Sequence, residues 1–317
     1  MDFEQMNQLD NKVLLSYSDL LKNKIKGSTM KFFTMSMASM VIISSLSAHS
    51  LWVNSFESLG GKRSSVTVSL GWGDKLPVSD SLSSLSIEKF SVSSPNDEKT
   101  MLNIPQLKDK KPSIQSAAFD VYDSDIALQK IMLKGQSPKG VYTVSANTHP
   151  TIYTKYINTK DEKVSSRKTM DEIDDAKKIL KSIKYQAFAK TYFNTGKWTE
   201  QQPINTKLEI VPKSDLSNVK VGDLVKFEVL FNGKALKKDA NGMKYIKAFS
   251  STFGQRDKFF LMSYIINGQA QVRVQSKGQW IVSCNHEEKV TKEGKLKDMY
   301  KKVNSLSYGA TITFQVK

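Results

Sequence analysis

The chain of 317 residues contains only one cysteine and three histidines. A single cysteine cannot form an internal disulfide, so the fold does not depend on one. Cys284 lies between Val282 and His286 in a segment typical of a strand, which predicts a small buried side chain rather than a nucleophile. Any imidazole chemistry therefore rests on His49, His149 and His286.

Recognisable catalytic motifs are also lacking. The sequence has no Gly-x-Ser-x-Gly elbow, no His-Glu-x-x-His helix and no Cys-x-x-Cys pair. Gly60-Gly61-Lys62 does not have the spacing of a phosphate-binding loop. These absences favour a protein that is not an enzyme.

Acidic residues are few relative to basic ones. The sequence has 47 Lys and Arg against 31 Asp and Glu, a net charge of +16. Such a charge suits nucleic acid or an anionic membrane surface, but no nucleic-acid recognition motif is present. The scattered lysines indicate a solvated surface, and we expect no nucleic-acid partner.

Only one long apolar segment is present, and it is typical of a secretory leader. Lys31 precedes the apolar and small residues from Phe32 to Leu46, a run too short to span a bilayer. Ser47-Ala48 follows as a small-residue cleavage site. This pattern predicts a signal peptide and a periplasmic protein.

The leader lies inside the chain rather than at its start, and it divides the sequence. A polar stretch around Gln201-Gln202-Pro203 is typical of a linker. We expect a mis-called or extended N-terminus at residues 1–29 and a signal peptide at 30–48. An N-terminal β-rich domain at 49–200 and a C-terminal β-sandwich domain at 206–317 should follow.

Cleavage after Ala48 would make His49 the first residue of the mature protein. Its free amine and its imidazole would then form a bidentate nitrogen site for a divalent metal. His149 and His286 follow predicted strands, so a shared rim with His49 is a hypothesis, although each histidine alone also fits a structural role. Asp74, in the loop after the first clear strand, either supplies an oxygen ligand or serves only the turn.

Most of the chain after the leader has the alternation of β-strands. Residues 66–70 show apolar residues at every second position, and Asn-Gly pairs at 232, 241 and 267 favour tight hairpins. Short strands joined by such turns predict two β-sandwich units of the immunoglobulin or transthyretin kind. The expected strands are 66–70, 87–92, 117–121, 127–133, 140–146, 224–231, 243–249, 259–266, 270–275, 280–284 and 310–316.

One segment has a helical pattern. Thr169 and Glu172 have the spacing of a capping box, and acidic residues precede lysines, which suits the helix dipole. Apolar residues then recur at three- and four-residue steps at Ile173, Ala176, Ile179, Leu180 and Ile183. The pattern predicts one helix near 170–190.

Several short blocks, taken in order, resemble a known family. They are Ala48-His49-Ser50-Leu51-Trp52, Leu70-Gly71-Trp72-Gly73, Leu208-Glu209-Ile210-Val211-Pro212, Val221-Gly222-Asp223, residues 229–236, Gly278-Gln279-Trp280 and residues 310–316. The chain is similar to the NikK-like periplasmic accessory proteins of bacterial nickel and cobalt uptake, a family also described as a domain of unknown function.

The resemblance implies a β-rich periplasmic protein that works beside a membrane metal transporter. It makes His49 and His286 the main ligand candidates, with His149 third. In the family pattern a histidine follows Gly-Trp-Gly, whereas Asp74 stands there in this chain. The implied ligand is a divalent transition metal, nickel or cobalt, with copper and zinc as alternatives.

Two other functions stay open from the residues. A terminal histidine with a second histidine also resembles the copper brace of secreted oxidative enzymes, which would require copper selectivity and redox turnover. A metal-free β-sandwich adhesion or carrier module is the third alternative, in which surface lysines meet acidic polymers or lipids.

Overall fold

The computed structural model describes residues 49–59, 64–76, 80, 84–104, 114–118, 120–121, 127–238, 242–254 and 259–317. The predicted leader and the residues before it lie outside these ranges. Residues 48–317 form one compact unit. Within the described part there is no α-helix, and three 3-10 turns cover Ser84–Ser86, Met170–Glu172 and Lys297–Met299.

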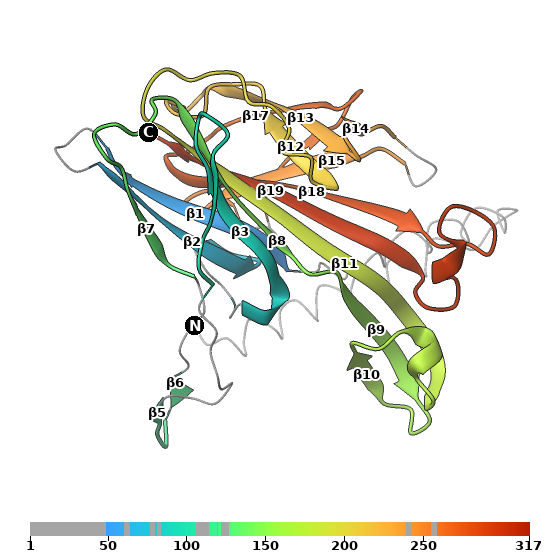
Figure 1. The fold of residues 1–317 in the computed structure, drawn as a ribbon. Helices are drawn as coiled ribbons and strands as arrows, with labels where there is room; N and C mark the ends of the chain where they lie inside the picture. The colour runs from blue at the N-terminus through green and yellow to red at the C-terminus, as the bar shows by residue number, and fades with distance from the viewer. Residues whose placement is uncertain are drawn as a thin grey trace, which may run out of the picture. The chain divides into compact units, whose positions relative to one another are not determined.

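A large sheet runs through the middle of this unit (Figure 1). Eight of its strands lie side by side in the order β16 (Leu261–Tyr264), β15 (Tyr245–Ser250), β18 (Gly278–Lys289), β19 (Ser305–Val316), β11 (Ala176–Asn194), β8 (Val141–Thr148), β3 (Ile87–Ser93) and β4 (Lys99–Met101). The other two strands branch from this row: β9 (Thr151–Asn158) pairs with β11 and with β10 (Lys163–Ser166). All pairs are antiparallel except β11 with β19.

Smaller sheets pack against this ten-stranded sheet. One contains β1 (Ser50–Ser58), β2 (Ser65–Gly73) and β7 (Gln129–Met132), and its β1 contacts β8, β11 and β19. Another contains β12 (Leu208–Pro212), β13 (Leu224–Phe231), β14 (Lys234–Ala235) and β17 (Gln269–Arg273), and its β12 contacts β18 and β19. A separate pair joins β5 (Ile114–Gln115) and β6 (Asp120–Val121).

Each smaller sheet buries an apolar core against the ten-stranded sheet. Val225, Phe227 and Val229 of β13 pack with Trp280, Val282 and Phe314 in one cluster. Residues of β1, β2, β3, β8 and β11 form a second cluster. Because side chains alternate along β8 and β11, and adjacent residues of these strands belong to different clusters, the two clusters occupy opposite faces of the sheet. The predicted mainly-β, sandwich-like class is confirmed, and the sheet takes strands from both sides of the predicted linker.

The predicted helix near 170–190 is wrong. The sequence there forms the 3-10 turn Met170–Glu172 and then the long strand β11. The backbone N–H of Thr169 does donate to the Glu172 carboxylate at 2.8 Å, so the capping residues are real but close only one short turn.

Two bulges explain the misleading periodicity in β11. Its register with β9 shifts between Ala176 and Lys178, and again between Ile179 and Lys181. Each shift inserts one extra residue into the strand. Partly buried positions therefore recur at Ala176 and Ile179, three residues apart, while Leu180 is 45% exposed. A bulged strand thus imitates the spacing of an amphipathic helix.

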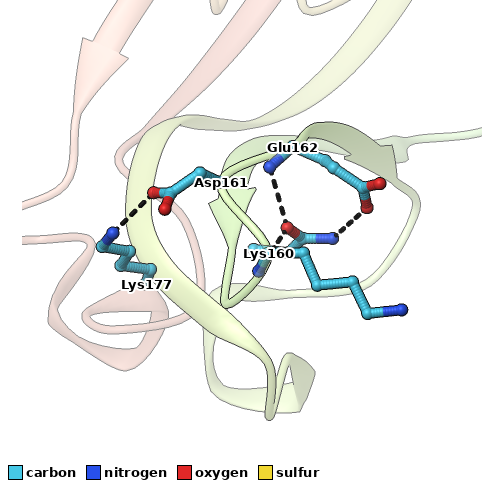
Figure 2. A network of polar contacts seen from close by, with 5 residues as sticks. Lys160, Asp161, Glu162 and Lys177 are labelled. Carbon is cyan, nitrogen blue, oxygen red and sulfur yellow. Dashed lines mark hydrogen bonds and ion pairs between the residues drawn. The ribbon is translucent and has the colours of Figure 1, made fainter.

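The hairpin between β9 and β10 is closed by a polar network at its tip (Figure 2). The Asn158 side-chain oxygen accepts from the backbone N–H groups of Lys160 and Glu162, at 3.0 and 2.9 Å. The Asn158 amide donates to the Glu162 carboxylate at 2.8 Å, and Lys177 of β11 pairs with Asp161. These contacts explain the exposed charges of this segment without any ligand.

Turn chemistry is predicted well elsewhere. Asn232 and Gly233 have φ values of 52° and 70°, and Asn267 and Gly268 have 50° and 82°. Positive φ at both central positions is the requirement of a tight hairpin. The pairs connect β13 to β14 and β16 to β17, while Asn241 lies outside the described residues.

Candidate functional site

The first described residue, His49, lies at the start of β1, which is firmly held. Leu51, Trp52 and Val53 are completely buried. The Thr311 hydroxyl of β19 donates to the Leu51 carbonyl at 2.6 Å, and the Tyr185 hydroxyl donates to the His49 carbonyl at 3.3 Å. The backbone of His49 is therefore fixed, while its side chain is 43% exposed.

Two carboxylates lie near the His49 imidazole, one at each ring nitrogen. Nδ1 lies 3.2 Å from an Asp80 carboxylate oxygen, and Nε2 lies 3.7 Å from an Asp74 carboxylate oxygen. The ring also meets Trp72 edge to face, with centroids 6.1 Å apart. The Nδ1 contact has hydrogen-bond length, whereas the Nε2 contact is longer than a hydrogen bond.

Strand pairing explains this arrangement. Ser50 of β1 is opposite Gly73 of β2, so the residues just beyond the pair, His49 and Asp74, also meet. The backbone N–H of Asp80 donates to the Trp72 carbonyl at 3.0 Å, which brings Asp80 back to the same strand end. No motif in the sequence singles out Asp80, and the one indication is its position six residues after Asp74.

The structure does not bring His286 to this group. His286 is buried in β18, with its ring 4.2 Å from that of Phe231 and opposite Tyr308 of β19. Its neighbour Asn285 points to the other face, where Asn285 and Tyr185 both approach Gly309. His286 and His49 therefore lie on opposite faces of the ten-stranded sheet.

His149 is placed in the turn between β8 and β9 and is exposed. Its backbone N–H donates to the Ser86 carbonyl at 2.9 Å, and its carbonyl accepts from the Thr151 hydroxyl at 3.3 Å. No contact joins it to His49 or Asp74 in the described part of the chain. Of the four predicted site residues, only His49 and Asp74 come together.

Cys284 is buried, as predicted, with 2% exposure and no disulfide. Burial raises the pKa of its thiol to about 12, against a weak opposing effect of Lys244. A thiol this hard to ionise is a poor nucleophile and a poor metal ligand.

Within the described residues, no group of three or more His, Cys, Asp or Glu side chains is arranged to hold a metal ion. His49 and Asp80 supply two such side chains, which meet at Nδ1 of the His49 ring. The α-nitrogen of His49 is an amide nitrogen in this chain, and it would become a donor only if the chain were cleaved after Ala48.

A cavity of about 500 Å³ lies at the opposite end of β1 from His49. Its lining includes Leu59, Lys134, Lys139 and Thr195, and none of the predicted site residues. No helix in the described part of the chain is long and apolar enough to cross a membrane.

These features define an all-β protein with sandwiched sheets and a histidine–carboxylate group at one strand end. The family DUF4198, described as a domain of unknown function, matches residues 46–288. This match covers most of the chain, so the protein belongs to that family. No curated protein matches the sequence.

Proposed function

We propose that this chain is an exported, periplasmic protein that binds one divalent transition-metal ion, nickel or cobalt. It would assist a membrane metal-uptake transporter by carrying the ion rather than transforming a substrate. The observation that supports this most is the contact between His49 Nδ1 and the Asp80 carboxylate at 3.2 Å. It lies at the residue that signal-peptide cleavage would turn into a new N-terminus.

The geometry suits a chelate made by one residue and completed by another. The α-amine and Nδ1 of a terminal histidine can bind one metal ion together, because both lie on the same side of the residue. Asp80 lies beside Nδ1 and can supply a third donor from that side. Imidazole and amine nitrogens with one carboxylate oxygen suit nickel, cobalt, copper and zinc.

Asp74 would have a different role in this proposal. It approaches Nε2, the ring nitrogen that faces away from the chelate. A carboxylate at that position orients the ring of a metal-bound histidine and strengthens its donor atom. Asp80 therefore replaces His286 and His149 as the preferred partner of His49, and Asp74 supports the site from outside.

The test is calorimetric titration of nickel, cobalt, copper and zinc into protein that begins at His49. We expect nickel or cobalt binding that His49→Ala abolishes. Asp80→Asn should weaken it strongly, and Asp74→Asn should weaken it by about 10- to 100-fold, the usual effect of losing an orienting carboxylate.

The matched control is Asp161→Asn, at an exposed ion pair of the β9–β10 hairpin. Titrations that show no heat with any of the four metals would contradict the proposal. Copper binding accompanied by oxygen- or peroxide-dependent turnover would instead support the copper-brace alternative.

A further inference from the structure

The cavity of about 500 Å³ lies where the ends of β1, β2, β7, β8 and β11 meet. Ser58 at the end of β1 is paired with Ser65 at the start of β2, and Ser65 is paired with Met132 at the end of β7. Val141 at the start of β8 is paired with Asn194 at the end of β11. Residues at and just beyond these strand ends line the cavity. Its volume is in the range of pockets that hold small organic molecules.

Hydrogen bonds hold the wall of the cavity that connects β7 to β8. The Lys134 N–H donates to the Ser137 hydroxyl at 2.9 Å, and the Ser137 N–H donates to the Lys134 carbonyl at 3.0 Å. The Thr195 N–H donates to the Gly140 carbonyl at 3.0 Å, and the Thr195 hydroxyl accepts from the Gly140 N–H at 3.3 Å. The cavity is therefore formed before any ligand enters, which lowers the cost of binding.

The side of the cavity toward the core is apolar. Leu59 and Leu133 line it, and both are partly buried against the core cluster of β1, β2, β3, β8 and β11. On the wall, a Cβ added to Gly135 would meet no atom within 4 Å, so there is open space beside it. A ligand here would contact leucine side chains, which favours a molecule with a carbon body over an inorganic oxyanion.

The charged side chains of the lining are all positive. Lys134 and Lys139 line the cavity, and no Asp or Glu is among the lining residues. Neither ammonium forms an ion pair with a carboxylate in the described part of the chain, whereas Lys177, Lys190 and Lys213 each do. A cavity lined by charge of one sign attracts ligands of the opposite sign.

Two carboxylates on neighbouring elements do not cancel this charge. Glu57 of β1 interacts with Lys317, and it does not line the cavity. Glu98 acts on the Tyr142 hydroxyl, which donates to the Pro138 carbonyl at 2.8 Å, and Glu98 is not part of the lining either. The two lysines therefore supply the charge that a ligand inside the cavity would meet.

We propose that this cavity binds a small organic dicarboxylate. Leu59 and Leu133 contact its carbon chain, and Lys134 and Lys139 pair with its carboxylates. This inference does not rest on the proposed metal binding, because the cavity shares no residue with the His49 group.

The test is calorimetric titration of succinate, adipate and suberate into the compact unit from Ala48 to Lys317, in the presence of EDTA so that metal plays no part. Hexanoate and hexanediol have the carbon chain of adipate with one carboxylate and with none, and inorganic phosphate has charge without a chain. We expect at least one dicarboxylate to bind about five- to tenfold more tightly than hexanoate or phosphate, because each of these lacks one of the paired features. Hexanediol should not bind.

Lys134→Gln and Lys139→Gln should each weaken dicarboxylate binding about two- to fivefold, since each removes one solvent-exposed ion pair. Gly135→Asp adds a carboxylate where there is open space and should weaken binding by a similar factor. The matched control is Lys163→Gln, which removes the same charge from an exposed lysine of β10 and should leave binding unchanged. Thermal melting should show that all four variants fold.

Four results would overturn the proposal. One is the absence of binding by all three dicarboxylates. Phosphate binding as tightly as the best dicarboxylate would show a site for any small anion, and equal binding of hexanediol would show an apolar pocket without charge selection. The last is a loss of affinity in Lys163→Gln as large as in the two cavity lysine variants, which would mean that the net charge of the protein, and not the cavity, attracts the ligand.

Discussion

Removing the charge of Lys190 should destabilise the fold more than most single substitutions. Its ammonium lies 2.6 Å from a Glu209 carboxylate oxygen, and the two side chains are only 4% and 2% exposed. The same Glu209 oxygen accepts from the backbone N–H of Ile204 at 2.8 Å. This pair joins β11 of the ten-stranded sheet to β12 of the four-stranded sheet.

The Lys190 ammonium keeps its charge in this buried position. Burial alone lowers the pKa of Lys190, but interactions with Tyr192 and Glu209 outweigh it and hold the pKa above its ordinary value. A lysine whose pKa is raised on folding contributes stability at all pH values below its unfolded pKa. That contribution is lost only as the pH rises through the folded value.

Lys190→Met leaves the Glu209 carboxylate buried, with the Ile204 N–H as its one remaining hydrogen-bond donor in the part of the chain that the structure describes. We expect a loss of about 3 to 5 kcal/mol in the free energy of unfolding, the usual result of breaking a buried pair. Since whole domains are stable by only about 5 to 15 kcal/mol, much of the stability would disappear. The double variant Lys190→Met, Glu209→Leu leaves no buried charge and should recover most of it.

Urea titration followed by tryptophan fluorescence can measure these values, because Trp52 and Trp280 are completely buried. A double-mutant cycle should show a strongly positive coupling between Lys190 and Glu209. Two results would contradict this prediction. One is a loss of less than about 1 kcal/mol in the free energy of unfolding for Lys190→Met, the value of an exposed pair. The other is a double variant whose loss equals the sum of the losses of the single variants.

Three further predictions concern the core and pH. Gly71→Ala would place a Cβ 2.0 Å from the Trp52 indole nitrogen and should lower the free energy of unfolding by about 1 to 3 kcal/mol or prevent folding, measured by urea titration. Thr313→Val removes the donor to the Val53 carbonyl and should cost about 1 to 3 kcal/mol, with faster hydrogen exchange in β1 as the readout. Because burial raises the pKa of Cys284 to about 12, the unfolded chain loses that thiol proton first as pH rises. Between pH 8 and pH 10 the free energy of unfolding of the unaltered protein should therefore fall by about 1 to 2 kcal/mol more than that of Cys284→Ala. Denaturation curves recorded in parallel for the two proteins measure this difference.

Local signals in the sequence predicted the strands that alternate cleanly and end in strong turns. The predicted strand 224–231 matches β13, Leu224–Phe231, and Asn232-Gly233 forms the turn that follows. Both features are local, because alternation and positive φ depend on a few adjacent residues. The prediction for the sequence of β11 was wrong for the opposite reason. The bulges of β11 depend on its pairing with β9, which lies elsewhere in the sequence.

The candidate site was predicted in part for a similar reason. His49 and Asp74 could be identified singly, but their meeting depends on the register of β1 with β2. Asp80 joins them through a backbone contact to Trp72 that no local pattern encodes. The separation of His286 follows from strand alternation in β18, but only once its sheet neighbours are known.

The position of His49 links metal affinity to processing in the proposed function. Since β1 is held through Leu51 and the hydroxyls of Thr311 and Tyr185, removal of the residues before His49 leaves those contacts in place. In the uncleaved chain the His49 nitrogen is an amide, so the Nδ1 side offers one nitrogen and the Asp80 carboxylate. Cleavage after Ala48 would add the amine and raise the number of donors from two to three. A precursor would then bind metal weakly, and the exported chain would acquire its affinity only where the metal is to be captured.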